Sequence, residues 1–146
     1  MSDRPMRAIS VRQPWAWAIL KGGKNVENRP RRDPWRSAVG QRVWVHASLT
    51  LGAVGDFQRV KQLVGGKPAD DDLTMTPGAV VGSVRITGVH IGESKKMGGC
   101  DGCSPWAVSG SWHLVLAEPE PLTTPILCRG ALGLFVPDLS SLAVSR

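Results

Sequence analysis

The chain has 146 residues, enough for one domain with a sizeable hydrophobic core and too few for two independently folded domains. A hydrophobic content of 42% and a charged content of 21% exclude wholesale disorder, a collagenous repeat and a coiled coil. The 17 glycines and 11 prolines favour a turn-rich, mostly β architecture, and the net charge of +6 at pH 7 favours anionic partners.

The positive charge is concentrated near the N-terminus. Residues 1–46 hold ten cations and three anions, a net charge of +7, whereas residues 47–146 carry −1. The same first third holds four of the six tryptophans: Trp15, Trp17, Trp35 and Trp44. Because cations neutralise phosphates and tryptophan rings stack on bases, this composition is typical of a nucleic-acid-binding surface. A small basic domain without a nucleic-acid partner is the alternative interpretation.

The sequence predicts neither a membrane span nor an exported protein. No apolar run approaches the roughly 20 residues that a membrane helix needs, and no charged, apolar and small-residue leader precedes the first predicted strand. Cys100, Cys103 and Cys128 are an odd number of cysteines, which argues against a secreted disulfide framework. We therefore expect a cytoplasmic protein with no membrane partner.

The first predicted elements are a strand and a helix. Residues 7–11 predict a short strand. Pro14 suits the first turn of a helix, where its missing N–H does no harm, and the helix is expected to continue to Lys21. Gly22 and Gly23 then end it, for which we expect a left-handed cap.

The middle of the chain alternates loops and regular elements. Residues 24–29 are predicted to be extended, and residues 30–39, with two prolines and three arginines, to form an exposed basic loop. Alternating polarity in residues 41–47 predicts a strand, and apolar spacing in residues 52–64 predicts a helix. Residues 65–77 carry three consecutive aspartates and are predicted to be a solvated linker.

The second half is rich in β-forming residues. Four such runs are separated by glycine and proline: residues 79–91, 111–117, 122–129 and 131–136. With the two helices, they predict an α+β fold built on a small curved sheet or barrel.

Two adjoining segments resemble a known family. Residues 9–16 read ISVRQPWA, and residues 22–29 read GGKNVENR. The second segment contains the signature G-x-K-x-x-E-x-R of the ASCH domain, with Lys24, Glu27 and Arg29 at its charged positions. Later segments also resemble the family's strands, so the resemblance covers nearly the whole chain, residues 1–146, as a single domain.

The resemblance implies a PUA-like β-barrel with flanking helices and a role with nucleic acids. Members of this superfamily commonly bind RNA or read modified bases, and ASCH relatives include coactivators, ribonucleases and hydrolases of acetylated cytidine. Since one fold can carry several activities, the site has to be argued from its own residues.

The signature residues define the predicted cleft. The resemblance implies that Lys24, Glu27 and Arg29 surround it, where lysine supplies a point charge for phosphate and arginine a planar fork. Glu27 would accept from an exocyclic amine or orient Lys24. In acetylcytidine-hydrolysing relatives a threonine nucleophile is implied at the position of Glu27. That hydroxyl is absent here, so a water activated by Glu27 is the remaining hydrolytic route. A structural ion pair is the alternative role.

Further binding residues are predicted on both sides of the signature. Gln13 can read an adenine edge, and Trp15 offers a stacking face worth about 1–3 kcal/mol per base, although a core position is the alternative for Trp15. Arg12 belongs to the same group because one helix joins it to Lys24. His46 and Ser48 follow a predicted strand, where His46 would carry a proton or donate to phosphate.

Three other tryptophans have roles that the sequence leaves open. Trp17 and Trp35 are the candidates for exposed aromatic side chains. Trp106 would either close over a bound base opposite Lys24 or pack its loop onto the barrel.

We predict neither a metal nor a cofactor. Cys100 and Cys103 form a C-x-x-C pair in a glycine-rich loop, but the sequence offers only Cys128 and scattered histidines as further ligands. Reduced thiols are expected, and a reversible Cys100–Cys103 disulfide is the alternative.

The leading hypothesis is a nucleic-acid-binding module that takes RNA, single-stranded DNA or a nucleotide, modified or not, in a basic cleft. The second is a small hydrolase of RNA or a modified nucleoside, in which Lys24 and Glu27 would be the catalytic residues. A third is a protein-binding module indifferent to Lys24. The oligomeric state is not defined by the sequence.

Overall fold

The computed structural model describes residues 4–91 and 104–140. Its strands are β1 (Ala8–Val11), β2 (Val26–Arg29), β3 (Arg42–Ala47), β4 (Ala79–Ile91) and β5 (Trp112–Leu127). Its helices are α1 (Trp15–Lys21) and α2 (Val54–Val64), with the short 3-10 turns η1 (Trp35–Ala38) and η2 (Leu73–Met75). The predicted α+β class is therefore confirmed.

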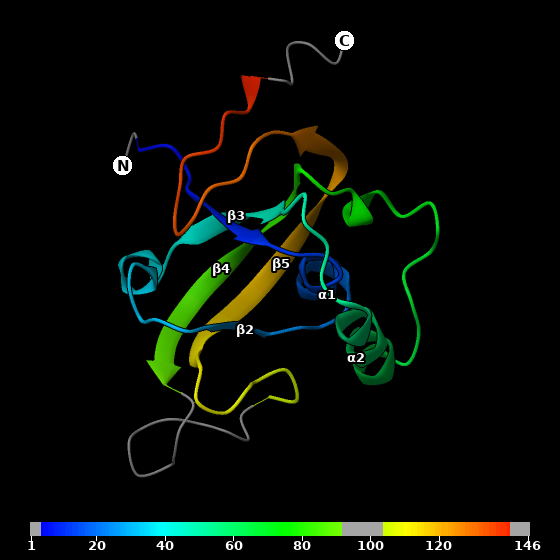
Figure 1. Cartoon of the computed structure of the whole chain (residues 1–146). Helices are drawn as coiled ribbons and strands as arrows, with labels where there is room; N and C mark the ends of the chain where they lie inside the picture. Colours follow the sequence, from blue (N-terminus) through cyan, green and yellow to red (C-terminus); the bar gives the residue numbers. More distant parts are fainter. Residues whose placement is uncertain (1–3, 92–103, 141–146) are drawn as a thin grey trace.

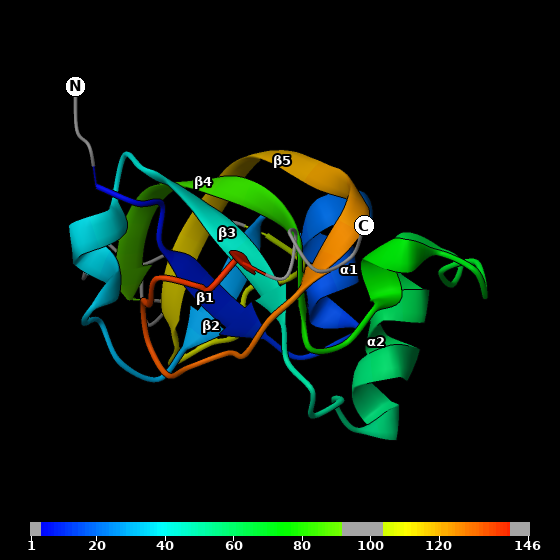
Figure 2. The ribbon, with the colours of Figure 1, turned by 90° about the horizontal axis from the view of Figure 1, so that it is seen from above.

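One five-stranded sheet organises the fold, with the strand order β1-β3-β4-β5-β2. The β1–β3 pair is parallel and the other pairs are antiparallel. Figures 1 and 2 show that the sheet is strongly curved, with α1 packed against it and α2 lying beside α1. The hydrogen-bonded order is open, so the sheet is barrel-like in its curvature while β1 and β2 remain its two edges.

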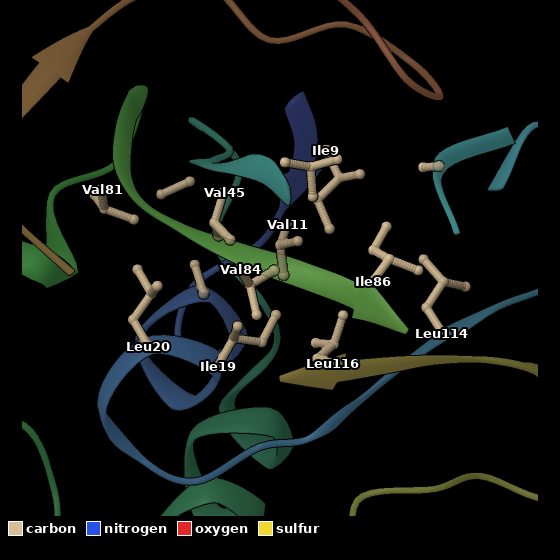
Figure 3. Close-up of a cluster of buried hydrophobic side chains, with 14 of the residues drawn as sticks. Ile9, Val11, Ile19, Leu20, Val45, Val81, Val84, Ile86, Leu114 and Leu116 are labelled. Carbon is tan, nitrogen blue, oxygen red and sulfur yellow. The ribbon is translucent and has the colours of Figure 1, made fainter. Parts of the chain in front are cut away.

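The main core lies between the sheet and α1. Alternation places Val43 and Val45 of β3 inside, both fully buried, as the sequence predicts. Helix α1 contributes Ile19 and Leu20, which face Val84 of β4 in the same cluster (Figure 3). Burial of branched side chains from four strands and one helix therefore fixes which face of the sheet is covered.

Helix α2 covers a second, smaller cluster. Of its residues only Val60 is buried, in contact with a group that includes Trp17 and Trp106. The helix ends at Gly65, whose positive φ of 80° suits glycine. At the end of α1 the expected left-handed glycine is Gly23, with φ 78°, whereas the cap residue Gly22 has φ −103°.

The two predicted strands at residues 111–117 and 122–129 are wrong as separate elements. They form one long strand, β5, which pairs with β4 along most of its length with three register shifts. The predicted strand at residues 131–136 is also wrong, because within the described residues this segment makes only an isolated bridge between Phe135 and Ala8.

The predicted exposed loop at residues 30–39 is only partly correct. Its arginines are exposed, but Trp35 and Ala38 are buried in the η1 turn. Trp17 is likewise buried, and its indole nitrogen donates to Asp72 over 3.0 Å. The prediction that Trp17 and Trp35 are exposed aromatic side chains is therefore wrong.

No helix within residues 4–91 and 104–140 is long and apolar enough to cross a membrane.

Candidate functional site

The signature residues form a compact ionic cluster. Glu27 accepts from both neighbouring cations: its Oε1 lies 3.2 Å from Lys24 Nζ and its Oε2 lies 3.0 Å from Arg29 Nη2. Lys24 also donates to the carbonyl of Val26, and Arg29 Nη2 donates to the carbonyl of Ser10 over 2.9 Å. The cluster thus ties β2 to the loop before it and to β1.

The environment of Glu27 favours its charged form. Burial by itself raises the pKa of this carboxyl, but the charges and hydrogen bonds of Lys24 and Arg29 outweigh burial and lower the pKa below its ordinary value of 4.5. A carboxylate with a lowered pKa and both oxygens engaged is a weak proton acceptor at neutral pH. These contacts favour an electrostatic role over the water activation considered from the sequence.

Aromatic rings flank both cations. Lys24 Nζ lies 5.4 Å from the ring centre of Trp15, and Arg29 Cζ lies 4.8 Å from that of Trp35. Trp106 packs edge-on against Trp15, with ring centres 6.4 Å apart. The half-buried Trp15 therefore contacts both Lys24 and Trp106.

The ionic cluster borders a groove of about 730 Å³ at the ends of β1, β2 and β3. Six of the predicted binding residues line it: Arg12, Trp15, Glu27, Arg29, His46 and Ser48. Arg12 is exposed, and no carboxylate within the described residues pairs with it, whereas Arg29 is held by Glu27. Arg12 is therefore the groove cation best placed to meet an anion.

A second pocket of about 300 Å³ adjoins the groove and shares Trp15, Glu27 and Asn28 with it. Lys24 lines this pocket, and so does Trp106, whose loop is held by Asn28. The Asn28 amide donates to the Trp106 carbonyl over 2.9 Å and accepts from the Val108 N–H over 2.8 Å. Lys24 is only 4% exposed, so its contact with a ligand is confined to this pocket.

The structure does not support the predicted base-reading role of Gln13. This residue is fully buried, with its amide nitrogen donating to the Thr74 carbonyl over 2.7 Å and its oxygen accepting from the Trp17 N–H over 3.0 Å. Both ends of the side chain are occupied within the fold, so Gln13 stabilises α1 and the η2 segment.

His46 sits beneath the groove surface, 1% exposed. Its Nδ1 lies 3.1 Å from Ser10 Oγ and its Nε2 lies 2.8 Å from the Cys128 carbonyl. Sequence analysis did not single out Ser10, Asn28 or Gly130, all of which line the groove. The alternation of β1 was the available signal for Ser10, since Ile9 and Val11 face the core.

The C-x-x-C pair of Cys100 and Cys103 lies outside the described residues. Within them, no three or more histidine, cysteine, aspartate or glutamate side chains are grouped to hold a metal ion. Cys128 is a free thiol there, and burial raises its pKa.

These features define a small α+β domain with a groove at one end of its curved sheet. No family model and no curated protein matches the sequence. Among solved structures the chain is similar to ASCH from Zymomonas mobilis, with 18% sequence identity, coverage of 98% of this chain and 96% of that one, and a TM-score of 0.54. Two point mutants of that protein match equally well, each at 17% identity and a TM-score of 0.54, over 99% and 97% of this chain and 97% of theirs. The coverage and the TM-score show that the chain shares the fold of these structures.

Proposed function

We propose that the protein binds single-stranded nucleic acid or a nucleotide in the groove lined by Arg12, Trp15 and Arg29. The observation that carries the proposal is the position of Arg12, an exposed cation without an ion pair in the described part of the chain, beside a half-buried tryptophan. The exposed cation suits a phosphate, and the tryptophan ring suits a stacked base.

The charge distribution supports the same proposal. The groove is built largely from residues 1–46, which carry a net charge of +7. Such a field attracts polyanions before contact and makes binding weaken with salt. Glu27 adds a fixed acceptor at the junction of groove and pocket, where an exocyclic amine, modified or not, would meet it.

The test is the binding of fluorescein-labelled single-stranded RNA and DNA, followed by fluorescence anisotropy at several salt concentrations. We expect Arg12→Ala to weaken binding about tenfold at low salt and to reduce the log–log salt slope by about one, because one charged phosphate contact is lost.

Arg36→Ala is the matched control, because Arg36 is an exposed arginine of the same basic third that does not line the groove. It should leave binding nearly unchanged. Binding that ignores salt, or an equal loss in the two variants, would contradict the proposal. Preference between RNA and DNA is read from the same titrations.

A further inference from the structure

Ser10 and His46 form a hydrogen-bonded pair in which the serine hydroxyl is the donor and the imidazole the acceptor. They face each other in the register of β1 and β3, with Ser10 Oγ 3.1 Å from His46 Nδ1. The other ring nitrogen, Nε2, lies 2.8 Å from the Cys128 carbonyl. A carbonyl only accepts, so Nε2 carries the proton, and in neutral imidazole Nδ1 is left with a lone pair toward the serine hydroxyl.

The pair is enclosed on the imidazole side and open on the serine side. His46 is 1% exposed and packs edge-on against Phe135, with ring centres 5.8 Å apart, whereas Ser10 is half-buried and lines the groove. Gly130 lies close to both, since a Cβ there would meet His46 Nδ1 at 2.8 Å and Ser10 Oγ at 3.0 Å. The serine hydroxyl is therefore the part of the pair that is more open to the groove.

Backbone amides without a hydrogen-bond partner among the described residues, and a cation, line the same groove. Gly130 and Ala131 line the groove, and their backbone N–H groups enter no hydrogen bond with other described residues. Arg12 lines the groove as well. A nucleophile with an oriented base, nearby amide donors and a free cation is the set that acyl transfer requires.

We propose that Ser10 is a nucleophile activated by His46, and that the groove hydrolyses carboxylic esters bearing an anionic group. Ser10 Oγ attacks the ester carbonyl carbon while His46 Nδ1 takes its proton, and the carbonyl electrons move onto oxygen. The intermediate collapses, the C–O bond to the alcohol breaks, and His46 returns the proton to the leaving alcohol.

Water completes the reaction. It attacks the acyl group on Ser10 as His46 Nδ1 takes one of its protons, and the acid departs when Ser10 Oγ recovers that proton. The balance is one ester and one water converted to one acid and one alcohol. Arg12 holds the anionic group of the substrate, so the hydrolysis uses the same groove as the proposed function but does not require a bound nucleic acid.

The first experiment uses a fluorophosphonate probe, which transfers its phosphonyl group to an activated serine with loss of fluoride. Intact-protein mass spectrometry should show a single adduct on the wild-type protein, and peptide mapping should place it on Ser10. Labelling should be absent in Ser10→Ala and about 100-fold slower in His46→Gln, because the base is removed. Ser111→Ala, a serine outside the groove, should label like the wild type.

A second experiment tests the activation of Ser10 in the wild-type protein, without any variant. Ser10 should be labelled at least about tenfold faster in the folded chain than in urea, where the pair with His46 is broken. Equal rates in the two conditions, an adduct on another serine, or no adduct at all would overturn the proposal. These results do not depend on oligonucleotide titrations, so this proposal and the proposed function fail separately.

The substrate class is tested with two activated esters, 4-nitrophenyl acetate and 4-nitrophenyl hemisuccinate, of which the second carries an additional carboxymethyl group. We expect a higher kcat/KM for the hemisuccinate in the wild type and loss of that preference in Arg12→Ala. Equal kcat/KM values in the wild type would overturn the assignment of an anionic substrate.

Discussion

Glu27 is held between two cations in a site where water has little access. Its side chain is 11% exposed and that of Lys24 3%, so neither charge is well solvated. The mutual attraction of such groups offsets the cost of burying them, and removing one partner leaves the other uncompensated. Glu27 therefore stabilises the fold in part by compensating the buried charge of Lys24.

We expect Glu27→Gln to lower the free energy of unfolding by about 3–5 kcal/mol, because Lys24 would remain buried without its counter-charge. Urea denaturation measures the change. Glu118→Gln is the control, since Glu118 pairs with Arg85 at 2.8 Å but its side chain is 61% exposed, and solvent screens such a pair so that its loss changes stability little. Equal losses in the two variants would contradict this account.

The same carboxylate makes stability depend on pH. The folded-state pKa of Glu27 is lowered from 4.5, so its contribution is complete above that value and is lost as the pH falls through the folded pKa. We expect the wild type to lose more stability than Glu27→Gln as the pH falls below about 4.5, as measured by urea midpoints at successive pH values. Parallel curves for the two proteins would show that Glu27 is not the titrating group.

The sequence predicted the site residues whose geometry is local, and it missed those whose roles depend on partners far along the chain. Lys24 and Glu27 come together because the signature spans only a turn and a short strand, so their spacing carries the geometry. Gln13 was misplaced because its partners, Thr74 and Trp17, include a residue far along the chain. Ser10 is a candidate site residue only because of its contact with His46, which lies 36 positions along the chain and is brought to it by β-sheet pairing.

At the level of elements, the close approach of β4, β5 and α1 depends on a glycine. Gly82 of β4 faces a crowded position, where a Cβ would lie 2.6 Å from the Glu120 carbonyl oxygen and 2.7 Å from Leu20 of α1. Gly88 lies on the same strand, but a Cβ there would meet only Val115, at 3.9 Å. Only the first of these positions has no room for a side chain.

We expect Gly82→Ala to destabilise the protein by about 1–3 kcal/mol, because the methyl group must displace a backbone oxygen or a packed leucine. Gly88→Ala, on the same strand, should be neutral or slightly stabilising, since the open site accepts a methyl and the unfolded chain loses freedom. Thermal unfolding of the two variants measures both effects. A larger loss in Gly88→Ala would refute the crowding argument.

The continuity of β5 was hidden by its prolines. Pro119, Pro121 and Pro125 read as breaks, because proline cannot donate within a sheet interior. Strand β2 pairs with only residues 112–115, so the later part of β5 has β4 on one side and no strand on the other within the described residues. Prolines are tolerated along such an edge because no neighbouring strand needs their missing N–H groups. Which strands pair is not visible in the local sequence.

At the scale of the whole molecule, one arginine links the two edges of the sheet. Arg29, at the end of β2, donates to the Ser10 carbonyl on β1, although these strands stand at opposite ends of the strand order. Its guanidinium also pairs with Glu27 and lies over Trp35. A planar guanidinium with several N–H donors can bind a carbonyl and a carboxylate and stack on a ring at the same time, whereas the ammonium group of a lysine cannot.

We expect Arg29→Lys to lower stability by about 1–3 kcal/mol and to speed amide hydrogen exchange in Ala8–Val11 and Val26–Arg29. Exchange followed by mass spectrometry locates the change. Arg85→Lys, which alters an exposed pair on β4, is the control and should leave both segments unaffected. Unchanged exchange in both edge strands of Arg29→Lys would mean that the curved sheet holds its edges without this bridge.

The position of Trp15 gives the protein a built-in optical reporter. Its indole borders both the groove and the adjoining pocket, whereas Trp17 and Trp35 are buried and line neither cavity. The chain has no tyrosine to contribute competing emission. A molecule entering the groove therefore alters the surroundings of Trp15, and one entering the pocket alters those of Trp15 and Trp106, so unlabelled ligands can be screened by quenching or a wavelength shift of tryptophan emission.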